Sequence, residues 1–77
     1  MKSYEQDRAA VRAEAEEAAH YLRHRERMTH MERVWEMCGT AANGYHCPTA
    51  VAEMLVKEAV SAFLDCRTEL ILDGVAA

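Results

Sequence analysis

The stretch that divides this chain of 77 residues reads Gly39-Thr40-Ala41-Ala42-Asn43-Gly44-Tyr45-His46-Cys47-Pro48. It holds two of the three glycines and ends at the only proline. Gly39 can take the left-handed conformation that ends a helix. Proline is favoured in the first turn of a helix, because its missing N–H costs nothing there. We therefore predict a loop in this stretch, with a helix on each side.

Both flanking segments have the signals of helices. No glycine or proline interrupts the segment before the loop, and Ser3 with Gln6 has the form of a capping box. The segment after the loop is followed by Gly74, which can terminate it. We expect a first helix at about 4–38, the loop at 39–47, a second helix at about 48–72 and a short tail at 73–77. The predicted fold is all-α: a single domain, built as a long helical hairpin.

Apolar residues of the first helical segment lie on two different faces. One face carries Tyr4, Val11, Ala15, Ala18 and Leu22, and roughly the opposite face carries Met28, Met31, Val34, Trp35 and Cys38. The change falls within residues 23–27, and Thr29 with Glu32 resembles a second capping box. We expect a continuous or gently bent helix, because no residue here breaks a helix. A kink or split near 25–29, which would give three helices, stays open as the alternative.

The second helix is apolar over more than half of its circumference. Its main stripe is Ala52, Leu55, Val56, Ala59, Ala62, Phe63, Cys66 and Leu70, and the opposite side is a solvated strip of Glu58, Ser61, Asp65 and Glu69. Val60, Leu64 and Ile71 widen the stripe beyond what one neighbouring helix covers. Small chains often gain missing burial by association. We therefore predict a homodimer that forms a four-helix bundle, with these three residues in the dimer interface.

Candidate residues for binding another protein lie in the middle of the chain. Trp, Tyr, Met and Arg are enriched in the cores of protein interfaces. This criterion selects Arg23, Arg25, Arg27, Met28, Met31, Trp35 and Tyr45. For the apolar members, the alternative is that they form ordinary bundle core.

Composition excludes several classes of protein. Hydrophobic residues make up 51% of the chain and charged residues 29%, so it is too apolar for a disordered tail. Charged residues interrupt every apolar run, and we expect no membrane partner. The formal net charge of -4 opposes binding to nucleic acid. The first residues lack an apolar signal segment and the three cysteines form no C-x-x-C pair, so we expect thiols in a cytoplasmic protein.

Metal and catalytic sites are not expected. His20 and His24 are spaced as two imidazoles that could share a metal on one helix, but the other potential ligands are scattered. We expect no metal and no cofactor. Cys47 follows His46 directly and could be considered as a thiol and imidazole pair, but the side chains of adjacent loop residues normally point apart. The sequence also identifies no third group that would orient the imidazole as a base. We therefore expect no enzymatic activity.

A compact acidic helical chain without a catalytic group can act mainly by binding other molecules through its surface. The expected function is that of a small non-enzymatic protein-binding module, a homodimer that sequesters or inhibits another protein. Size and composition suggest a phage or mobile-element protein. Two alternatives stay open: a DNA-associated regulator that uses the segment from Arg23 to Arg33, and a metal-binding helical module that uses His20 and His24.

Overall fold

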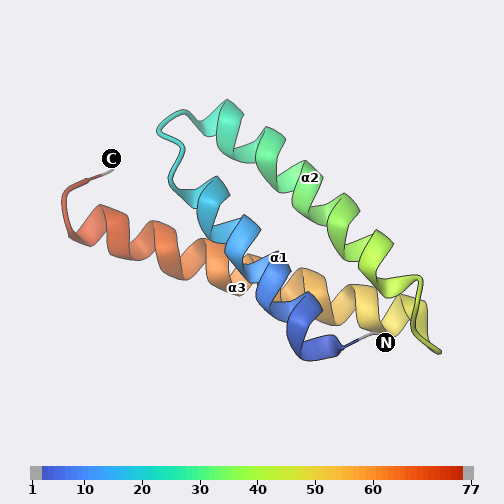
Figure 1. Cartoon of the computed structure of the whole chain (residues 1–77). Helices are drawn as coiled ribbons and strands as arrows, with labels where there is room; N and C mark the ends of the chain where they lie inside the picture. Colours follow the sequence, from blue (N-terminus) through green and yellow to red (C-terminus); the bar gives the residue numbers. More distant parts are fainter. Residues whose placement is uncertain (1–2, 76–77) are drawn as a thin grey trace.

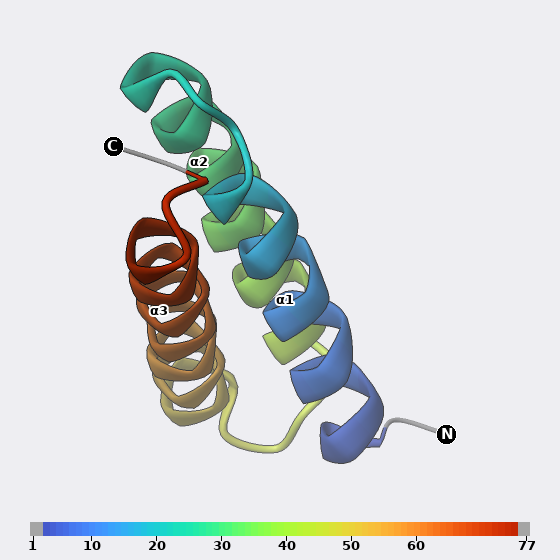
Figure 2. The same cartoon turned by 90° about the vertical axis from the view of Figure 1, so that its left-hand side faces the viewer.

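The computed structural model describes residues 3–75, which form three helices and no strand. The helices are α1 (Tyr4–Ala19), α2 (His24–Ala42) and α3 (Pro48–Leu72). They pack as an up-down-up bundle with extents of 43 × 20 × 17 Å (Figures 1 and 2). Along the described residues, none of the helices combines the length and apolar content that a bilayer span needs. The all-α prediction is confirmed, whereas the first segment of the expected hairpin is two helices.

Three helix ends follow from local sequence as predicted. The Ser3 hydroxyl caps α1 by accepting from the Gln6 backbone N–H, with an N···O distance of 3.4 Å. Pro48 occupies the first turn of α3. Gly74 has a φ of 74° and ends α3, and its backbone N–H donates to a carbonyl of the last helical turn. Each of these ends depends on residues within one turn of chain, which is why the sequence shows them.

The turn at residues 20–23 corrects the continuous helix that we expected, and it lies upstream of the alternative split near 25–29. No residue in this turn has a positive φ angle. Instead, the Arg27 guanidinium donates to the carbonyl oxygens of Tyr21 and Leu22, at 2.8 and 2.9 Å. Both carbonyls belong to the turn itself, so the Arg27 side chain holds the chain reversal that follows the end of α1 at Ala19.

Two further side chains complete this helix end. The Arg67 guanidinium, from α3, donates to the Ala19 carbonyl at 3.0 Å. The His20 ring nitrogen Nδ1 lies 2.8 Å from the Glu16 carbonyl of its own helix. Because Arg67 is 48 residues away from Ala19 in the sequence, no local pattern could have placed the turn here.

The change of apolar face is explained by this reversal of the chain. Val11 on α1 and Val34 on α2 are both buried in one core, although they lie on opposite faces of the expected single helix. Folding back at residues 20–23 directs both faces inward. Leu22 is not directed inward, because it lies in the turn and is 74% exposed. Met28 and Trp35 also remain partly exposed, at 37% and 38%.

Two expected signals inside α2 are wrong. Gly39 lies within the helix, which continues to Ala42, so the loop is 43–47 instead of 39–47. A helical glycine costs about 1 kcal/mol relative to alanine, and burial of Ala42 in the interior favours the extension. Thr29 is no helix start either, since its hydroxyl donates to the Arg25 carbonyl one turn earlier, at 2.9 Å.

The core is small and rich in alanine. It consists of Val11, Ala15, Ala18, Met31, Val34, Cys38, Leu55, Ala59 and Ala62. The alanines lie on α1 and α3, and small side chains let two helices approach closely. Among the three pairs of helices, α1 and α3 contact each other most extensively.

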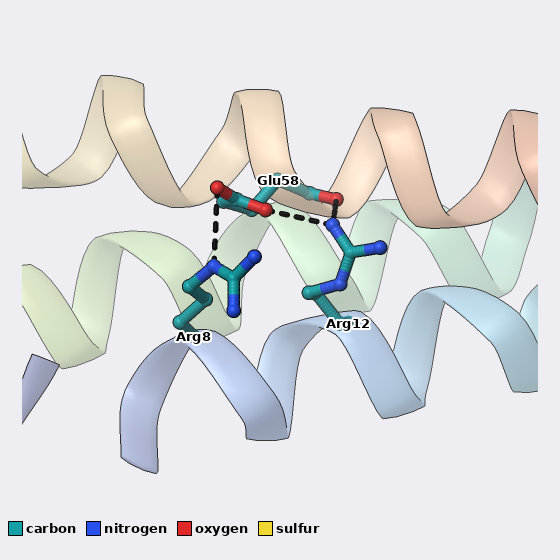
Figure 3. Close-up of polar contacts among 3 residues, drawn as sticks. All are labelled: Arg8, Arg12 and Glu58. Atoms are coloured by element: carbon teal, nitrogen blue, oxygen red, sulfur yellow. Dashed lines mark hydrogen bonds and ion pairs between the residues drawn. The ribbon is translucent and has the colours of Figure 1, made fainter. Parts of the chain in front are cut away.

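Glu58 clamps α1 to α3, which corrects its assignment to a solvated acidic strip (Figure 3). Its Oε1 lies 2.7 Å from Arg12 Nη1, and its Oε2 lies 3.1 Å from Arg8 Nε. Arg12 also donates to the Glu58 backbone carbonyl at 3.3 Å. Hydrogen bonds from Arg8 and then from Arg12 lower the pKa of the Glu58 carboxyl below its ordinary value. The sequence pattern missed this contact because the partners are 46 or more residues apart.

Candidate protein-binding groove

An apolar groove lies between α2 and α3, with a volume of about 370 Å³. It is lined by Met28, Met31, Glu32, Trp35, Val60, Phe63 and Leu64, and we call it the α2/α3 groove. Figure 1 shows that the two helices diverge from the 43–47 loop toward their other ends. Glu32 is the one charged residue of the lining, so the surface that the groove offers is almost entirely apolar.

Large side chains form this groove. Met31 is buried and Phe63 is half-buried, whereas Trp35 is 38% and Leu64 is 55% exposed. The edges of the groove therefore leave apolar surface in contact with water. Each large apolar side chain that is fully buried stabilises a fold or complex by roughly 1.5–3 kcal/mol, which makes this surface a candidate for covering by a partner.

The groove unites two sets of residues that the sequence analysis kept apart. Met28 and Trp35 were predicted to bind another protein, and Val60 and Leu64 to form a dimer interface; here they line the same depression. Met31 also lines the groove, but it is only 3% exposed and belongs to the core, which is the alternative given for the apolar candidates. Ile71, the third predicted dimer residue, is exposed and lies beyond the lining.

The arginines selected as partner contacts lie at the α1–α2 turn, outside the groove lining. Arg23 precedes α2 as its N-cap. Arg27 holds the turn through the two carbonyls described above. Arg25 lines a separate depression, together with Arg33 and His30. The basic segment is therefore divided between structural contacts and another surface.

Tyr45 has an intramolecular partner. Its hydroxyl donates to Asp7 Oδ2 at 2.6 Å, which ties the 43–47 loop to the start of α1. This hydrogen bond to a carboxylate, followed by burial and the negative charge of Asp7, raises the pKa of Tyr45 to about 12. Tyr45 is not among the residues that line the groove, so we interpret it as a loop anchor.

His20 and His24 do not share a helix face, because the chain turns between them. His20 caps the end of α1, and His24 is the first residue of α2. The helical spacing that suggested a shared metal is therefore lost. Beside His20, at 3.8 Å from its Nδ1, lies the Cys66 thiol, which is half-buried instead of filling the core.

A different set of potential ligands comes together between α1 and α2. Ligand atoms of Glu14, Glu17 and His30 lie within 4.8 Å of one another, and His30 Nε2 is 3.1 Å from Glu14 Oε2. The Tyr21 ring packs against the imidazole, at 5.5 Å between centroids. Imidazole and carboxylate ligands suit zinc, but Arg25 lines the same depression as His30 and its positive charge opposes a bound cation. The sequence did not reveal this cluster because its members lie on two helices.

Cys38 and Cys66 have the properties of structural cysteines. Burial raises the pKa of Cys38, which lies in the core. Burial, followed by the charge of Glu16, also raises the pKa of Cys66. A thiol with a raised pKa is mostly protonated at neutral pH, and the protonated form is a poor nucleophile.

Comparison of this chain with known protein families, with curated proteins and with solved structures finds no match. Its function is therefore inferred from the geometry described above.

Proposed function

We propose that the chain is a small non-enzymatic protein-binding module whose binding surface is the α2/α3 groove. The observation that supports this proposal most is the row of large apolar side chains that two helices leave open to water. An amphipathic helix binds such a groove by laying its apolar face into it. The lining contains no set of converging polar groups that could activate a substrate.

Trp35 is the residue from which we expect the largest contribution to binding. Tryptophan is enriched among the few interface residues that carry most of the binding free energy. Met28 lies two turns before Trp35 on the same face of α2, and its unbranched side chain can adapt to different partners. Leu64 faces both from α3. A partner that buries these three side chains gains free energy that offsets the loss of freedom on association.

The proposed role of the module, which is a homodimer in its free form, is to sequester or inhibit another protein. The net charge of -4 disfavours nucleic acid as the partner. Arg27 already donates to two backbone carbonyls, which weakens the alternative of a DNA-associated regulator that uses this segment.

Metal binding at Glu14, Glu17 and His30 is a second candidate function, supported by the closeness of their ligand atoms. Titration of the purified chain with zinc in a calorimeter tests it. Binding at one zinc per chain that is lost in His30→Ala would favour this role. No heat of binding at millimolar zinc would reject it.

Affinity capture from the native cell tests the groove as a protein-binding surface. Leu64→Glu places a charge in the groove, whereas Leu72→Glu introduces the same charge at a residue that is 79% exposed and outside the lining. We expect a specific protein to be retained by the wild type and by Leu72→Glu and lost with Leu64→Glu, while circular dichroism shows that all three fold. Capture that Leu64→Glu leaves intact would contradict the proposed surface.

A further inference from the structure

We propose that a second copy of this chain covers the α2/α3 groove, with a two-fold axis that runs roughly along the bundle. This inference rests on the proposed function, because it names the occupant of the same groove in the free protein. A target protein that binds in the groove takes the place of the second copy, so target binding and dimerisation exclude each other. Three observations carry it: the apolar surface on both helices, the opposite directions of these helices, and the charges along their outer edges.

The directions of α2 and α3 make the groove suited to its own copy. The two helices run antiparallel within one chain (Figure 2). A two-fold axis along the bundle keeps each helix direction, so α2 of one chain faces α3 of the other and again runs antiparallel to it. The result is a four-helix arrangement with antiparallel neighbours, a stable packing for amphipathic helices.

Charges along the outer edges are complementary in this arrangement. Glu36 follows Trp35 on α2, and Lys57 precedes Val60 by one turn on α3; both are exposed. Neither side chain takes part in a hydrogen bond or ion pair among the described residues. Glu36 lies six residues before the end of α2 and Lys57 nine residues after the start of α3. Because the two helices run antiparallel from the 43–47 loop, both residues lie at similar levels along the bundle, within one helical turn. The two-fold axis therefore places Glu36 opposite the partner's Lys57, and this pair occurs twice.

The exposed area is compatible with such a dimer. The chain exposes 5245 Å², whereas a folded monomer of 8.7 kDa is expected to expose about 4,700 Å². A standard interface covers about 800 Å² on each partner, roughly 15% of the exposed area of this chain. An interface of this area can be formed by the apolar groove together with the outer edges of α2 and α3. It would remove mainly hydrophobic side chains from water.

Charge reversal with compensation tests the dimer and its arrangement together. Sedimentation velocity at micromolar concentration should give about twice 8.7 kDa for the wild type. The dimer contains the pair of Glu36 and Lys57 twice, so Glu36→Lys or Lys57→Glu replaces two attractive charge pairs by two repulsive ones. We expect each single variant to raise the dimer Kd about tenfold. The double variant Glu36→Lys/Lys57→Glu should recover the wild-type Kd. Asp65→Lys, an exposed reversal on the side of α3 that faces α1, should leave it unchanged.

A wild type that stays monomeric at 100-fold higher concentration would overturn the proposal, and so would a double variant no better than the singles. The outcomes also separate this inference from the proposed function. A monomeric wild type that still captures another protein through Leu64 refutes the second copy and leaves the binding module intact. If the wild type dimerises, the double variant recovers its Kd and no other protein is captured, the second copy is the occupant of the groove and the proposed function is refuted.

Discussion

The two interfaces of α3 differ in the size of the side chains that form them. Toward α1, the alanines Ala59 and Ala62 are buried and Glu58 is clamped between two arginines. Toward α2, Trp35 and Leu64 remain partly open to water around a groove of about 370 Å³. Small residues with a polar clamp close one interface, whereas large apolar residues leave the other incomplete. The incomplete interface is the one that we expect to bind a partner.

Leu55→Ala should have the largest effect, because Leu55 is fully buried in the core that all three helices share. Loss of a buried leucine costs about 2–5 kcal/mol, a large part of the roughly 4–12 kcal/mol expected for a chain of this length. Urea denaturation measures the difference. Leu64→Ala makes the same change at the open groove and, in the monomer, should cost well under half as much. Equal losses would show that the two interfaces are alike.

Ala62→Leu tests whether the α1/α3 interface is closed. Ala62 is 1% exposed, and extra methylene groups in a packed interior cost about 1–3 kcal/mol. Val60→Leu enlarges a neighbouring residue at the groove instead, and we expect a change within about 0.5 kcal/mol. Thermal unfolding monitored by circular dichroism compares the two. A stable Ala62→Leu variant would indicate unfilled space between α1 and α3.

Glu58→Gln should destabilise the chain by an amount that depends on pH. The pKa of Glu58 is lowered in the folded state by hydrogen bonds from Arg8 and Arg12. The ionised form is therefore the one that folding favours, and its contribution is present above the ordinary pKa of about 4.5. This contribution disappears as pH falls through the lowered value. Denaturation curves at several pH values should show the wild type and the variant converging in acid, whereas Glu53→Gln, at an exposed position, should have little effect at any pH.

The smallest effect is expected at the loop. Tyr45 should ionise with a pKa of about 12, because its neutral hydroxyl donates to the Asp7 carboxylate and its ionised form would meet that negative charge. Absorbance at alkaline pH follows this ionisation, and Tyr45→Phe identifies the step. In Asp7→Asn the pKa should fall toward the ordinary value near 10. A pKa of Tyr45 near 10 in the wild type would mean that the loop is not anchored to α1.

Features that depend on neighbouring residues could be predicted from the sequence. Ser3, Pro48 and Gly74 mark helix ends through contacts within one turn. The turn at residues 20–23 could not be located in this way, because Arg67 contacts it from α3. The change of apolar face in the first segment was the available signal. It is explained by a reversal of the chain, whereas the absence of a helix-breaking residue favoured one continuous or gently bent helix.

The candidate site was predicted in its residues but not in its arrangement. Met28, Trp35, Val60 and Leu64 were selected by residue type and helical spacing, and they line one groove. We assigned them to two surfaces, whereas the packing of α2 against α3 in a three-helix arrangement places them around one groove. The contacts of Glu58 with Arg8 and Arg12 were missed because they also depend on how the helices pack. The partner of a charged residue on a polar helix face can be identified only when the neighbouring helix is known.

Trp35 is the only tryptophan of the chain, so its fluorescence reports directly on whether the groove is covered. In a dilute monomer its side chain is 38% exposed, and acrylamide should quench its emission efficiently. We predict that quenching falls and the emission shifts to shorter wavelength as the concentration rises through the range in which the mass doubles. Leu64→Glu should abolish both changes. Quenching that stays constant while the mass doubles would place the contact elsewhere and contradict the groove as the binding surface.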